Sequence, residues 1–324
     1  MTKAIRFHKT GGPEVLQWED VDVGQPAEGQ VRVRHTAVGL NYIDVYHRTG
    51  VYPMPLPSGI GLEAAGVVEA LGPGVSDLKA GDRIAYASAP IGAYAQARLM
   101  PANRVVKVPD GVSDVQAAGM MLQGLTAQYL IRRTYPAKKG ETLLIHAAAG
   151  GVGLILVQWA KHLGCTVIGT AGSEAKCKLA KAHGCDHVID YTKEDFAKRV
   201  AEITNGARVP AVYDGVGKDT FMKSLDSLAP LGVLASFGNA SGTVPPFDLG
   251  ILAAKGSLYV TRPTLNTYTA KREDLVASAN DLFDVVQKGA VKILVNQTYA
   301  LKDAAQAHRD LEARKTTGAT VFTV

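Results

Sequence analysis

The segment from Gly140 to Lys161 constrains the fold of this 324-residue chain more than any other. Its apolar run Leu143–Ile145 is too short for a helix and is bounded by Gly140 and by small residues, which is typical of a buried strand. The glycine-rich turn Ala148-Ala149-Gly150-Gly151-Val152-Gly153 follows at once, and an amphipathic run then continues to about Leu163. This order predicts a strand, a tight turn and a helix.

The turn has the composition of a site for a pyrophosphate. It is a G-x-G-x-x-G pattern with alanine in place of the first glycine. Without side chains at Gly150 and Gly151, phosphates could approach the backbone N–H groups at the positive start of the helix, and Gly153 would let the helix lie close to the strand. Because glycine turns also occur in ordinary loops, the flanking strand and helix carry the argument. The residues of the turn that we expect to bind a dinucleotide are Ala149, Gly150, Gly151, Val152 and Gly153.

Composition limits the class of protein. The chain is 47% hydrophobic and 20% charged, which predicts a soluble globular protein of about two domains. Its net charge of +5 is spread along the sequence without a basic run, so it suits an anionic cofactor better than a nucleic acid. Neither a signal peptide nor a membrane span is expected. Three cysteines, Cys165, Cys177 and Cys185, make no disulfide framework, which predicts a cytoplasmic location.

Residues 1 to about 122 are predicted to be rich in strands and turns. Short apolar or alternating runs such as Val31–Arg34, Gly66–Val68 and Arg83–Tyr86 are separated by glycine- and proline-containing turns. This rhythm is typical of a small barrel, and no alternation of helix and strand is expected there.

From Gly140 the rhythm changes to alternating helix and strand. After the strand at 143–145, the candidate strands are Thr166–Thr170, His187–Asp190, Ala211–Asp214, Val233–Phe237 and Leu258–Thr261. Six such strands predict an α/β fold with a doubly wound parallel sheet. A helix is expected from about Lys271 to Gly289, and the segment 291–324 is expected to return to the first domain. The predicted limits are 1–123 and 264–324 for the β-rich domain and 124–263 for the cofactor domain.

The chain also resembles a known family. The matching positions of the family signature are Gly140-Glu141, Leu144, Ala148-Ala149-Gly150-Gly151, Gly153, Gln158 and Lys161, and the likeness extends over essentially the whole chain. They are similar to the quinone oxidoreductase (zeta-crystallin-like) branch of the medium-chain dehydrogenase/reductase superfamily. The resemblance implies a GroES-like β-rich catalytic domain, a six-stranded Rossmann cofactor domain, and NADPH-dependent reduction of quinones.

The zinc ligands of related alcohol dehydrogenases are replaced in this sequence. Zinc in proteins prefers cysteine and histidine ligands in a tetrahedral arrangement. Asn41 stands in the place of the ligand cysteine, Leu62 in that of the histidine, and no cysteine precedes Cys165. The sequence therefore predicts an enzyme without a metal.

The end of the second strand of the cofactor domain favours NADPH over NADH. An NAD site usually places an acidic residue there, whereas Val167–Gly172 contains none. Ser173 and Lys176 follow, and a hydroxyl and a cation suit a 2′-phosphate, although Lys176 is also consistent with a solvated helix residue. The resemblance adds Tyr191 and Arg314 as contacts of this phosphate.

Further cofactor contacts are expected where other strands of the sheet end, because ligands of such sheets collect there. Asp214–Gly217 and Phe237–Asn239 both follow an apolar strand, and their glycines suit either a close approach to the cofactor or a plain turn. The resemblance implies a lining made of Asn41, Tyr42, Thr126, Gly215, Val216, Phe237, Gly238, Asn239 and Ser241.

The expected chemistry is hydride transfer from a nicotinamide to an electron-poor acceptor such as a quinone, with the protein supplying a donor for the developing oxyanion. The candidate donors are the phenols of Tyr46 and Tyr52, with Asn41 as a weaker one. Each tyrosine is also consistent with a packing ring whose hydroxyl is hydrated. Solvent could supply the proton, so no dedicated general acid is predicted.

Two other functions stay open at this stage. The same sheet and the same hydride would serve the reduction of an activated double bond in 2-alkenals or enones. A non-catalytic role, RNA-binding or crystallin-like, belongs to another class, and the absence of a concentrated basic or aromatic strip in the sequence argues against RNA.

The last predicted strand suggests how the chain associates. Residues 256–262 would lie at the edge of the parallel sheet, and an open apolar edge needs a partner or a cover. Pairing with a second copy would give a homodimer, as the resemblance also implies.

Overall fold

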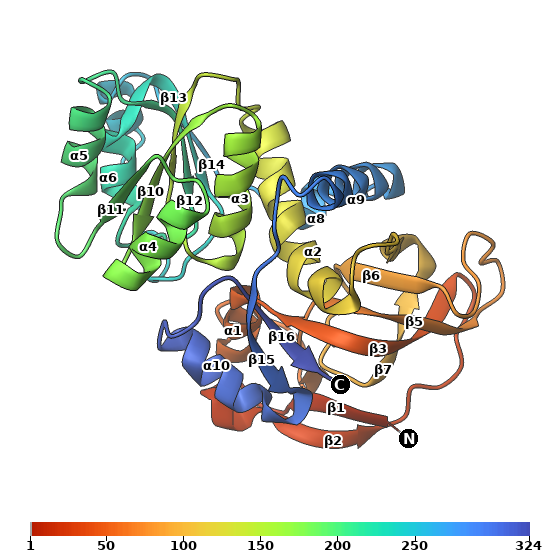
Figure 1. Ribbon diagram of the computed structural model, residues 1–324. Helices are drawn as coiled ribbons and strands as arrows, with labels where there is room; N and C mark the ends of the chain where they lie inside the picture. The colour runs from red at the N-terminus through yellow and green to blue at the C-terminus, as the bar shows by residue number, and fades with distance from the viewer. Residues whose placement is uncertain (1) are drawn as a thin grey trace. The chain divides into compact units, whose positions relative to one another are not determined.

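The computed structural model describes residues 2–324 and divides into two compact units, each with its own hydrophobic core (Figure 1). The first unit comprises the chain up to Leu125 together with Thr269–Gln287 and Ile293–Val324. The second unit comprises Thr126–Tyr268 and Lys288–Lys292.

The first unit is built mainly from antiparallel strands, as the sequence predicts. Its strands are β1 (Thr2–Phe7), β2 (Gln17–Val21), β3 (Gln30–Leu40), β4 (Ser58–Gly59), β5 (Glu63–Leu71), β6 (Arg83–Ala87), β7 (Ala97–Pro101), β8 (Val106–Lys107), β15 (Val295–Ala300) and β16 (Ala319–Thr323). The larger sheet has the order β15-β16-β3-β5-β6-β8, with β7 also paired to β3, and the smaller one has the order β2-β1-β4. The three runs proposed as strands all lie within longer strands of the larger sheet.

Strand β3 continues past His35, whose side chain is buried without a charge. Its Nδ1 lies 2.6 Å from the carbonyl oxygen of Ala95, and its Nε2 lies 2.9 Å from the hydroxyl of Tyr86. Burial lowers the pKa of His35 to about 3, so the imidazole is neutral and both ring nitrogens have partners. A polar residue is therefore compatible with the apolar interior, and the strand does not end there.

Helices α1 (Tyr42–Thr49) and α2 (Asp114–Tyr129), which fall within or overlap the region predicted to be rich in strands and turns, were not expected from the sequence. Helix α1 follows Asn41, whose backbone N–H donates to the Asp44 carboxylate at 2.9 Å. It ends at Gly50, which has a φ of 82°. The Asn-x-x-Asp spacing and the final glycine are thus helix boundary signals within the region predicted to be rich in strands and turns. Helix α2 follows β8 and a turn, and the limit between the two units at Leu125–Thr126 falls within it.

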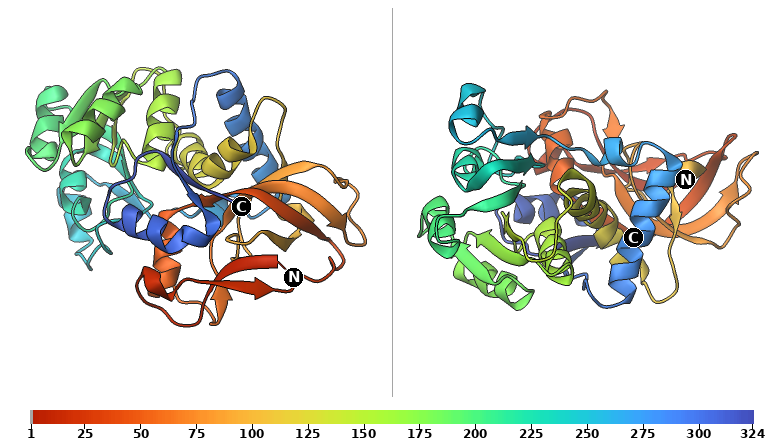
Figure 2. Two further views of the ribbon diagram at one scale, coloured as in Figure 1. Left: turned by 60° about the horizontal axis from the view of Figure 1, so that its bottom comes forward. Right: turned by 90° about the horizontal axis from the view of Figure 1, so that it is seen from above.

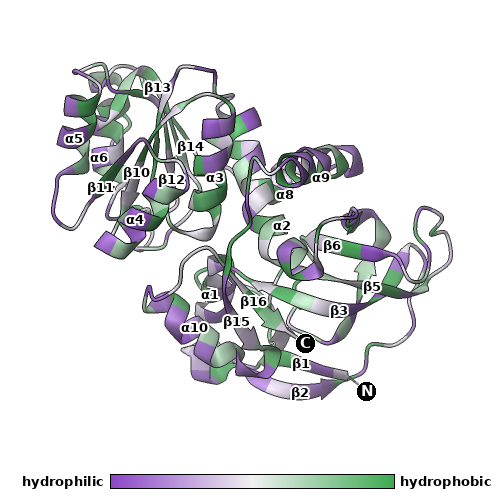
Figure 3. Cartoon of the chain, viewed as in Figure 1, coloured by the Kyte–Doolittle hydropathy of each residue, from purple (hydrophilic) through white to green (hydrophobic). Residues whose placement is uncertain are grey.

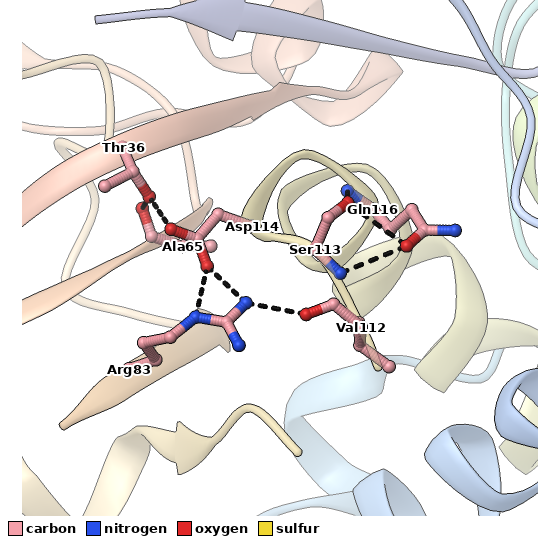
Figure 4. A network of polar contacts seen from close by, with 7 residues as sticks. All are labelled: Thr36, Ala65, Arg83, Val112, Ser113, Asp114 and Gln116. Atoms are coloured by element: carbon pink, nitrogen blue, oxygen red, sulfur yellow. Dashed lines mark hydrogen bonds and ion pairs between the residues drawn. The ribbon is translucent and has the colours of Figure 1, made fainter. Parts of the chain in front are cut away.

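A polar network fixes the start of α2 to the larger sheet (Figure 4). One Asp114 carboxylate oxygen accepts from Arg83 Nε at 2.9 Å and from Nη2 at 2.6 Å, and the other accepts from the Thr36 hydroxyl at 2.7 Å. Arg83 also donates to the Val112 carbonyl at 2.6 Å. Ser113 and Gln116 bond reciprocally beside this network and form a capping box.

Replacing Asp114 with alanine should therefore destabilise the first unit by about 2 kcal/mol, because Arg83 Nε loses its acceptor, and Arg83 Nη2 and the Thr36 hydroxyl keep only backbone carbonyls. The measurement is thermal or urea unfolding. Asp77→Ala provides the control, since Asp77 lies 3.5 Å from Arg272 in an exposed ion pair. Such a pair contributes about 0–1 kcal/mol. Equal losses in the two variants would contradict the structural role of the network.

The C-terminal segment completes the larger sheet of the first unit. Strand β16 pairs antiparallel with β3 and parallel with β15, so the blue end of the chain lies against early strands in Figures 1 and 2. Helix α10 (Ala304–Glu312) packs beside the short helical turn Pro13–Val15. The helix expected from about Lys271 to Gly289 is present as α9 (Arg272–Gln287).

The second unit is a six-stranded parallel sheet, as predicted. Its strands are β9 (Thr142–Ile145), β10 (Thr166–Ala171), β11 (His187–Asp190), β12 (Val209–Asp214), β13 (Leu228–Ser236) and β14 (Tyr259–Thr261), in the order β11-β10-β9-β12-β13-β14. The helices that belong to it are α3 (Gly151–His162), α4 (Glu174–Ala182), α5 (Phe196–Ile203), α6 (Phe221–Asp226), α7 (Gly250–Ala254) and α8 (Leu265–Tyr268). This strand order is that of a dinucleotide-binding fold.

The strand order also determines which helices cover each face of the parallel sheet. The chain moves outwards in one direction from β9 to β11 and in the other from β12 to β14. Right-handed crossovers therefore place α3 and α4 on one face and α5 and α6 on the other. In Figure 3 green dominates the strands of this sheet, whereas purple recurs on α4, α5 and the connecting loops, as expected for a sheet covered on both faces.

No helix within residues 2–324 combines the length and the apolar character that crossing a lipid bilayer requires.

Candidate active site

The glycine turn of the second unit exposes an uncapped helix start. Gly150 precedes α3 with extended backbone angles (φ −80°, ψ 175°), and no side chain accepts a hydrogen bond from the first turn. The first N–H groups of any α-helix have no partner within the helix. The start of α3, at Gly151, Val152 and Gly153, therefore offers backbone donors and the positive end of the helix dipole to an anion.

Gly153 is required by a close approach of backbone atoms. A Cβ atom there would lie 2.2 Å from the carbonyl oxygen of Ala147 and 2.9 Å from the Cα of Ala148. The approach is therefore to the turn itself, rather than to the strand as the sequence suggested. Ala147 has a φ of 50°, in the left-handed region that non-glycine residues seldom adopt, which shows how tightly the turn is wound.

The end of β10 presents hydroxyl groups and no acidic side chain. Ser173 precedes α4, and its hydroxyl accepts from the backbone N–H of Lys176 at 3.4 Å. Glu174 is turned to solvent and is paired with Lys178 at 2.7 Å. Tyr191 follows β11, and its hydroxyl lies beside Gly172, where a Cβ atom would come within 2.5 Å of it. These groups thus lie in one region, at the carboxyl ends of β10 and β11: Ser173, the Lys176 backbone and Tyr191.

A buried carboxylate shapes the loop after β12. Asp214 Oδ1 accepts from the backbone N–H groups of Val216 at 2.8 Å and Gly217 at 3.1 Å. Its Oδ2 accepts from the hydroxyls of Thr220 at 2.7 Å and Ser224 at 3.2 Å. Asp214 therefore holds the predicted contact Val216 in place, a role that the sequence did not reveal.

Asp214 is one end of a longer buried network. His146 Nε2 lies 2.9 Å from the Ser224 hydroxyl, and its Nδ1 lies 2.8 Å from the hydroxyl of Thr170. Burial lowers the pKa of His146, which favours the neutral imidazole. The network joins the ends of β9, β10 and β12 to α6 and so fixes the edge of the sheet where the candidate contacts lie.

The loops after β12 and β13 pack directly on each other. A Cβ atom at Gly238 would lie 2.3 Å from the carbonyl oxygen of Gly215, and one at Gly215 would lie 3.0 Å from the Phe237 ring. The Ser241 hydroxyl donates to the Val216 carbonyl at 2.9 Å. The structure thus brings these predicted residues together, and mutual loop packing is one reason for the two glycines.

Arg262 and the last turn of α2 add two further supports in the second unit. Arg262, at the end of β14, donates to the carbonyl oxygens of Ser236 at 2.7 Å and Gly238 at 3.3 Å, and with its amide suitably oriented Asn239 bonds both Arg262 and Gly238. Thr126 is buried on α2, in the same helix as Tyr129, whose ring stacks on Tyr268 at 4.5 Å.

In the first unit, Asn41 lies within a buried chain of polar side chains. Its Nδ2 donates to Glu63 Oε2 at 2.5 Å, and its Oδ1 accepts from Gln123 Nε2 at 3.3 Å. Glu63 Oε1 accepts from the backbone N–H of Leu122 at 2.8 Å. Glu63 is fully buried, and burial raises its pKa to about 8 against the opposing effect of these hydrogen bonds.

A second buried group begins at the backbone of Asn41. Asp44 Oδ2 accepts from the Asn41 N–H and from the Tyr94 hydroxyl at 2.8 Å, and the same hydroxyl lies 3.2 Å from His308 Nε2. Burial raises the pKa of Asp44 to about 7 and lowers that of His308 to about 3. Asp44 Oδ1 has no hydrogen-bond partner. The sequence prediction missed this group because its members come from distant segments.

The predicted tyrosines form an aromatic row on and beside α1. Ring centroids are 5.4 Å apart for Tyr42 and Tyr46 and 5.2 Å apart for Tyr46 and Tyr52. Tyr46 is buried, and Tyr52 is half-buried. Burial raises the pKa of Tyr42, and the nearby guanidinium of Arg314 opposes that shift, so Arg314 lies in the same neighbourhood. The three rings thus form one aromatic group, which begins at Tyr42, the residue after Asn41.

Within residues 2–324, no group of three or more histidine, cysteine, aspartate or glutamate side chains is arranged to hold a metal ion. Asn41 is bonded to Glu63 and Gln123, and neither it nor Leu62 belongs to such a group.

Comparisons with known proteins agree with this architecture. The alcohol dehydrogenase GroES-like domain family matches residues 27–110, and the zinc-binding dehydrogenase family matches residues 151–279. A quinone oxidoreductase of Pseudomonas aeruginosa is 53% identical over 323 residues, which are 99% of each chain. A 2-haloacrylate reductase of a Burkholderia species is 48% identical over 333 residues, again 99% of each chain.

A solved structure with a bound cofactor is equally similar. The Escherichia coli quinone oxidoreductase in complex with NADPH is 48% identical, superposes with a TM-score of 0.98, and is covered over 99% of this chain and 100% of that one.

Proposed function

We propose that this chain, which belongs to the quinone oxidoreductase family of the medium-chain dehydrogenases/reductases, reduces quinones with NADPH. The observation that carries the proposal is the uncapped start of α3 at the glycine turn, whose backbone donors suit a pyrophosphate. The P. aeruginosa and E. coli relatives named quinone oxidoreductase support the choice of acceptor.

The residues of the second unit fit NADPH. Gly150–Gly153 would hold the pyrophosphate, and the Ser173 hydroxyl, Lys176 and Tyr191 would hold the 2′-phosphate. Arg314, which the family resemblance implies, is proposed as a further cation for this phosphate. The absence of an acidic side chain at the end of β10 removes the repulsion that this phosphate would meet in an NAD site. When bound, NADPH supplies the hydride that reduces the acceptor.

The remaining proposed contacts position the nicotinamide half of the cofactor. They are Asn41, Tyr42, Thr126, Gly215, Val216, Phe237, Gly238, Asn239 and Ser241. Asp214 and Ser241 hold the loop at Val216 in one conformation, so this part of the site is formed before a ligand binds.

The proposed catalytic residues are Tyr46, Tyr52 and Asn41, whose donor groups would stabilise the negative charge that develops on the acceptor oxygen. Replacing Tyr46 or Tyr52 with phenylalanine should lower kcat for quinones at least about 10-fold while the NADPH KM changes little, because a transition-state donor is lost. Steady-state rates of the two single variants and the double variant measure this.

The control for these variants is Tyr299→Phe. Tyr299 lies on β15, its hydroxyl donates to Asp310 of α10 at 3.0 Å, and it has no proposed part in the reaction. Rates for both site variants equal to that of Y299F would mean that the tyrosines only pack.

The function is tested by the initial rate of NADPH oxidation by metal-stripped protein with several quinones and several 2-alkenals under the same conditions. We expect quinone reduction to survive the removal of metal, since Asn41 and Leu62 replace the zinc ligands of related dehydrogenases. We also expect NADPH to be oxidised faster than NADH. Turnover that requires added zinc, or the absence of quinone turnover, would contradict the proposal.

One observation favours a second candidate activity. The Burkholderia relative at 48% identity is named a 2-haloacrylate reductase, and a 2-haloacrylate contains an electron-poor carbon–carbon double bond. The same hydride could reduce such a bond. Turnover of alkenals without turnover of quinones would make this chain a double-bond reductase.

Three further properties belong to the proposal. The chain forms a homodimer through residues 256–262, because β14 is the edge of the parallel sheet and Tyr259 on it is 60% exposed; a monomeric mass in solution at micromolar concentration would overturn this. The first unit, predicted from the sequence as residues 1–123 and 264–324, acts as the catalytic domain, and the second, predicted as 124–263, acts as the cofactor domain. The protein works in the cytoplasm, which suits its three free cysteines.

A further inference from the structure

We propose that Glu63 is a positioning residue that fixes the orientation of the Asn41 amide in the site assigned above to NADPH and the acceptor, an inference that rests on that proposed function. Nothing in the sequence signature of the family or in the names of the relatives assigns a role to Glu63.

Both oxygens of Glu63 are committed to donors. Oε1 accepts from the backbone N–H of Leu122, and Oε2 accepts from Asn41 Nδ2 at 2.5 Å. The Met121 backbone adds a further hydrogen bond. Since a carboxylate can only accept, it forces the nitrogen side of the Asn41 amide to face it.

The orientation then passes from Asn41 to Gln123. With Nδ2 directed at Glu63, the Asn41 oxygen is directed at Gln123 and accepts from its Nε2 at 3.3 Å. A primary amide looks nearly the same after a half-turn but exchanges donor for acceptor. Glu63 therefore determines which side of the Asn41 amide is the donor and which is the acceptor. A ligand that contacts Asn41 must match this arrangement.

The surroundings leave Glu63 little freedom to move. It is fully buried on β5, and a Cβ atom at Gly39 of the neighbouring strand would lie 2.3 Å from Glu63 Oε2 and 2.2 Å from the Ala118 carbonyl. Only glycine fits there, so the carboxyl group is packed against backbone. Its position is set by the fold and not by a flexible side chain.

The protonation of Glu63 should control the same orientation. Burial raises its pKa to about 8, and the titratable groups that act on it or are acted on by it are Asp44, Tyr86 and Tyr94, none of which is a cation. A protonated Glu63 can donate and would favour the Asn41 oxygen facing it. The orientation seen here belongs to the ionised form.

Glu63→Gln isolates this effect at nearly constant volume. The Leu122 N–H still needs an acceptor, so the new amide oxygen stays with it and the new Nε2 faces Asn41. Asn41 must then turn its oxygen towards residue 63, and Gln123 must turn as well. The variant thus imitates protonated Glu63 at every pH.

The experiment is the affinity for NADPH, measured by fluorescence titration near pH 7 and near pH 9, together with KM and kcat for one quinone. We expect E63Q to bind NADPH about 10-fold more weakly than wild type at the higher pH, the effect of one hydrogen bond to a charged group, and nearly equally at the lower pH. A merely structural role would give the same ratio at both values.

Asp114→Asn is the matched control, because it makes the same carboxylate-to-amide change in the same unit away from the proposed site. It should leave the affinity for NADPH unchanged at both pH values. If E63Q does not fold, Asn41→Ala tests the same point. Without the Asn41 amide, the affinity for NADPH should no longer change between the two pH values as it does in wild type.

The outcomes separate the inference from the function on which it rests. Wild type that binds no NADPH would overturn the proposed function and the inference with it. Wild type that binds and reduces quinones, with an E63Q variant equal to it or weaker by one factor at every pH, would overturn only the inference.

Discussion

Replacing Gly153 with alanine is expected to lower the affinity for NADPH at least about 100-fold, equivalent to roughly 2.7 kcal/mol of binding free energy. The added Cβ would lie 2.2 Å from the Ala147 carbonyl oxygen, and that contact is to backbone, so no side chain can rotate away. The turn must open or the first turn of α3 must shift, and either change moves the N–H groups proposed to bind the pyrophosphate. Fluorescence titration with NADPH measures the loss.

The same substitution should also destabilise the second unit, by about 2–4 kcal/mol, because strain at a tightly wound turn is among the larger mutational effects. Gly250→Ala is the control: it lies at the start of α7, where the atoms nearest to an added Cβ belong to the exposed Asp248 side chain, at 3.3 Å. G250A should bind NADPH like wild type. A G153A variant with unchanged affinity would mean that the glycine turn does not bind the cofactor.

The parallel sheet was predictable from the sequence for a physical reason. A strand buried on both faces is a short apolar run, and Leu143–Ile145 and Ala211–Asp214 have that form whatever their partners. The glycine turn adds a local signal, because the reason for Gly153 lies only a few residues away, at Ala147. In contrast, α1 was missed because it is only 8 residues long, and its boundary signals, Asn41 with Asp44 and the final Gly50, lie in a segment where strands and turns were expected.

The candidate site likewise contains residues that the sequence could predict and residues that it could not. Ser173 and Val216 could be proposed from their position after apolar strands, since strand ends collect ligands in such sheets. The buried acceptors could not, because their partners are distant in sequence: Glu63 meets Asn41 and Leu122, and Asp44 meets Tyr94. For Glu63 the available signal was an acidic residue next to the apolar residues that continue β5, where an unpaired charge would be costly.

The buried carboxyl groups also make stability depend on pH in a direction opposite to that of a salt-bridged acid. Burial raises the pKa of Asp44 from 3.8 to about 7, so between these values the native state holds a proton that the unfolded chain has lost. The free energy of unfolding therefore falls as the pH rises through this window and levels off above it. A rise of roughly three units in the pKa corresponds to a loss of on the order of 4 kcal/mol in the free energy of unfolding once the pH is above this window.

Asp44→Asn should remove this dependence while keeping the packing. The amide oxygen can still accept from the Asn41 N–H and the Tyr94 hydroxyl, and the new nitrogen takes the place of Oδ1, which has no partner to lose. Urea unfolding from pH 4 to pH 8 should show D44N gaining on wild type as the pH rises. The Asp44 charge also raises the pKa of Glu63, so the two groups are coupled. The free energy of unfolding of the double variant D44N/E63Q should therefore vary least with pH. Its loss of pH dependence should be smaller than the sum of the losses in the two single variants. Parallel pH profiles for wild type and D44N would show that Asp44 ionises in the native state as readily as in the unfolded chain, and would remove burial as the force that keeps this carboxyl group neutral.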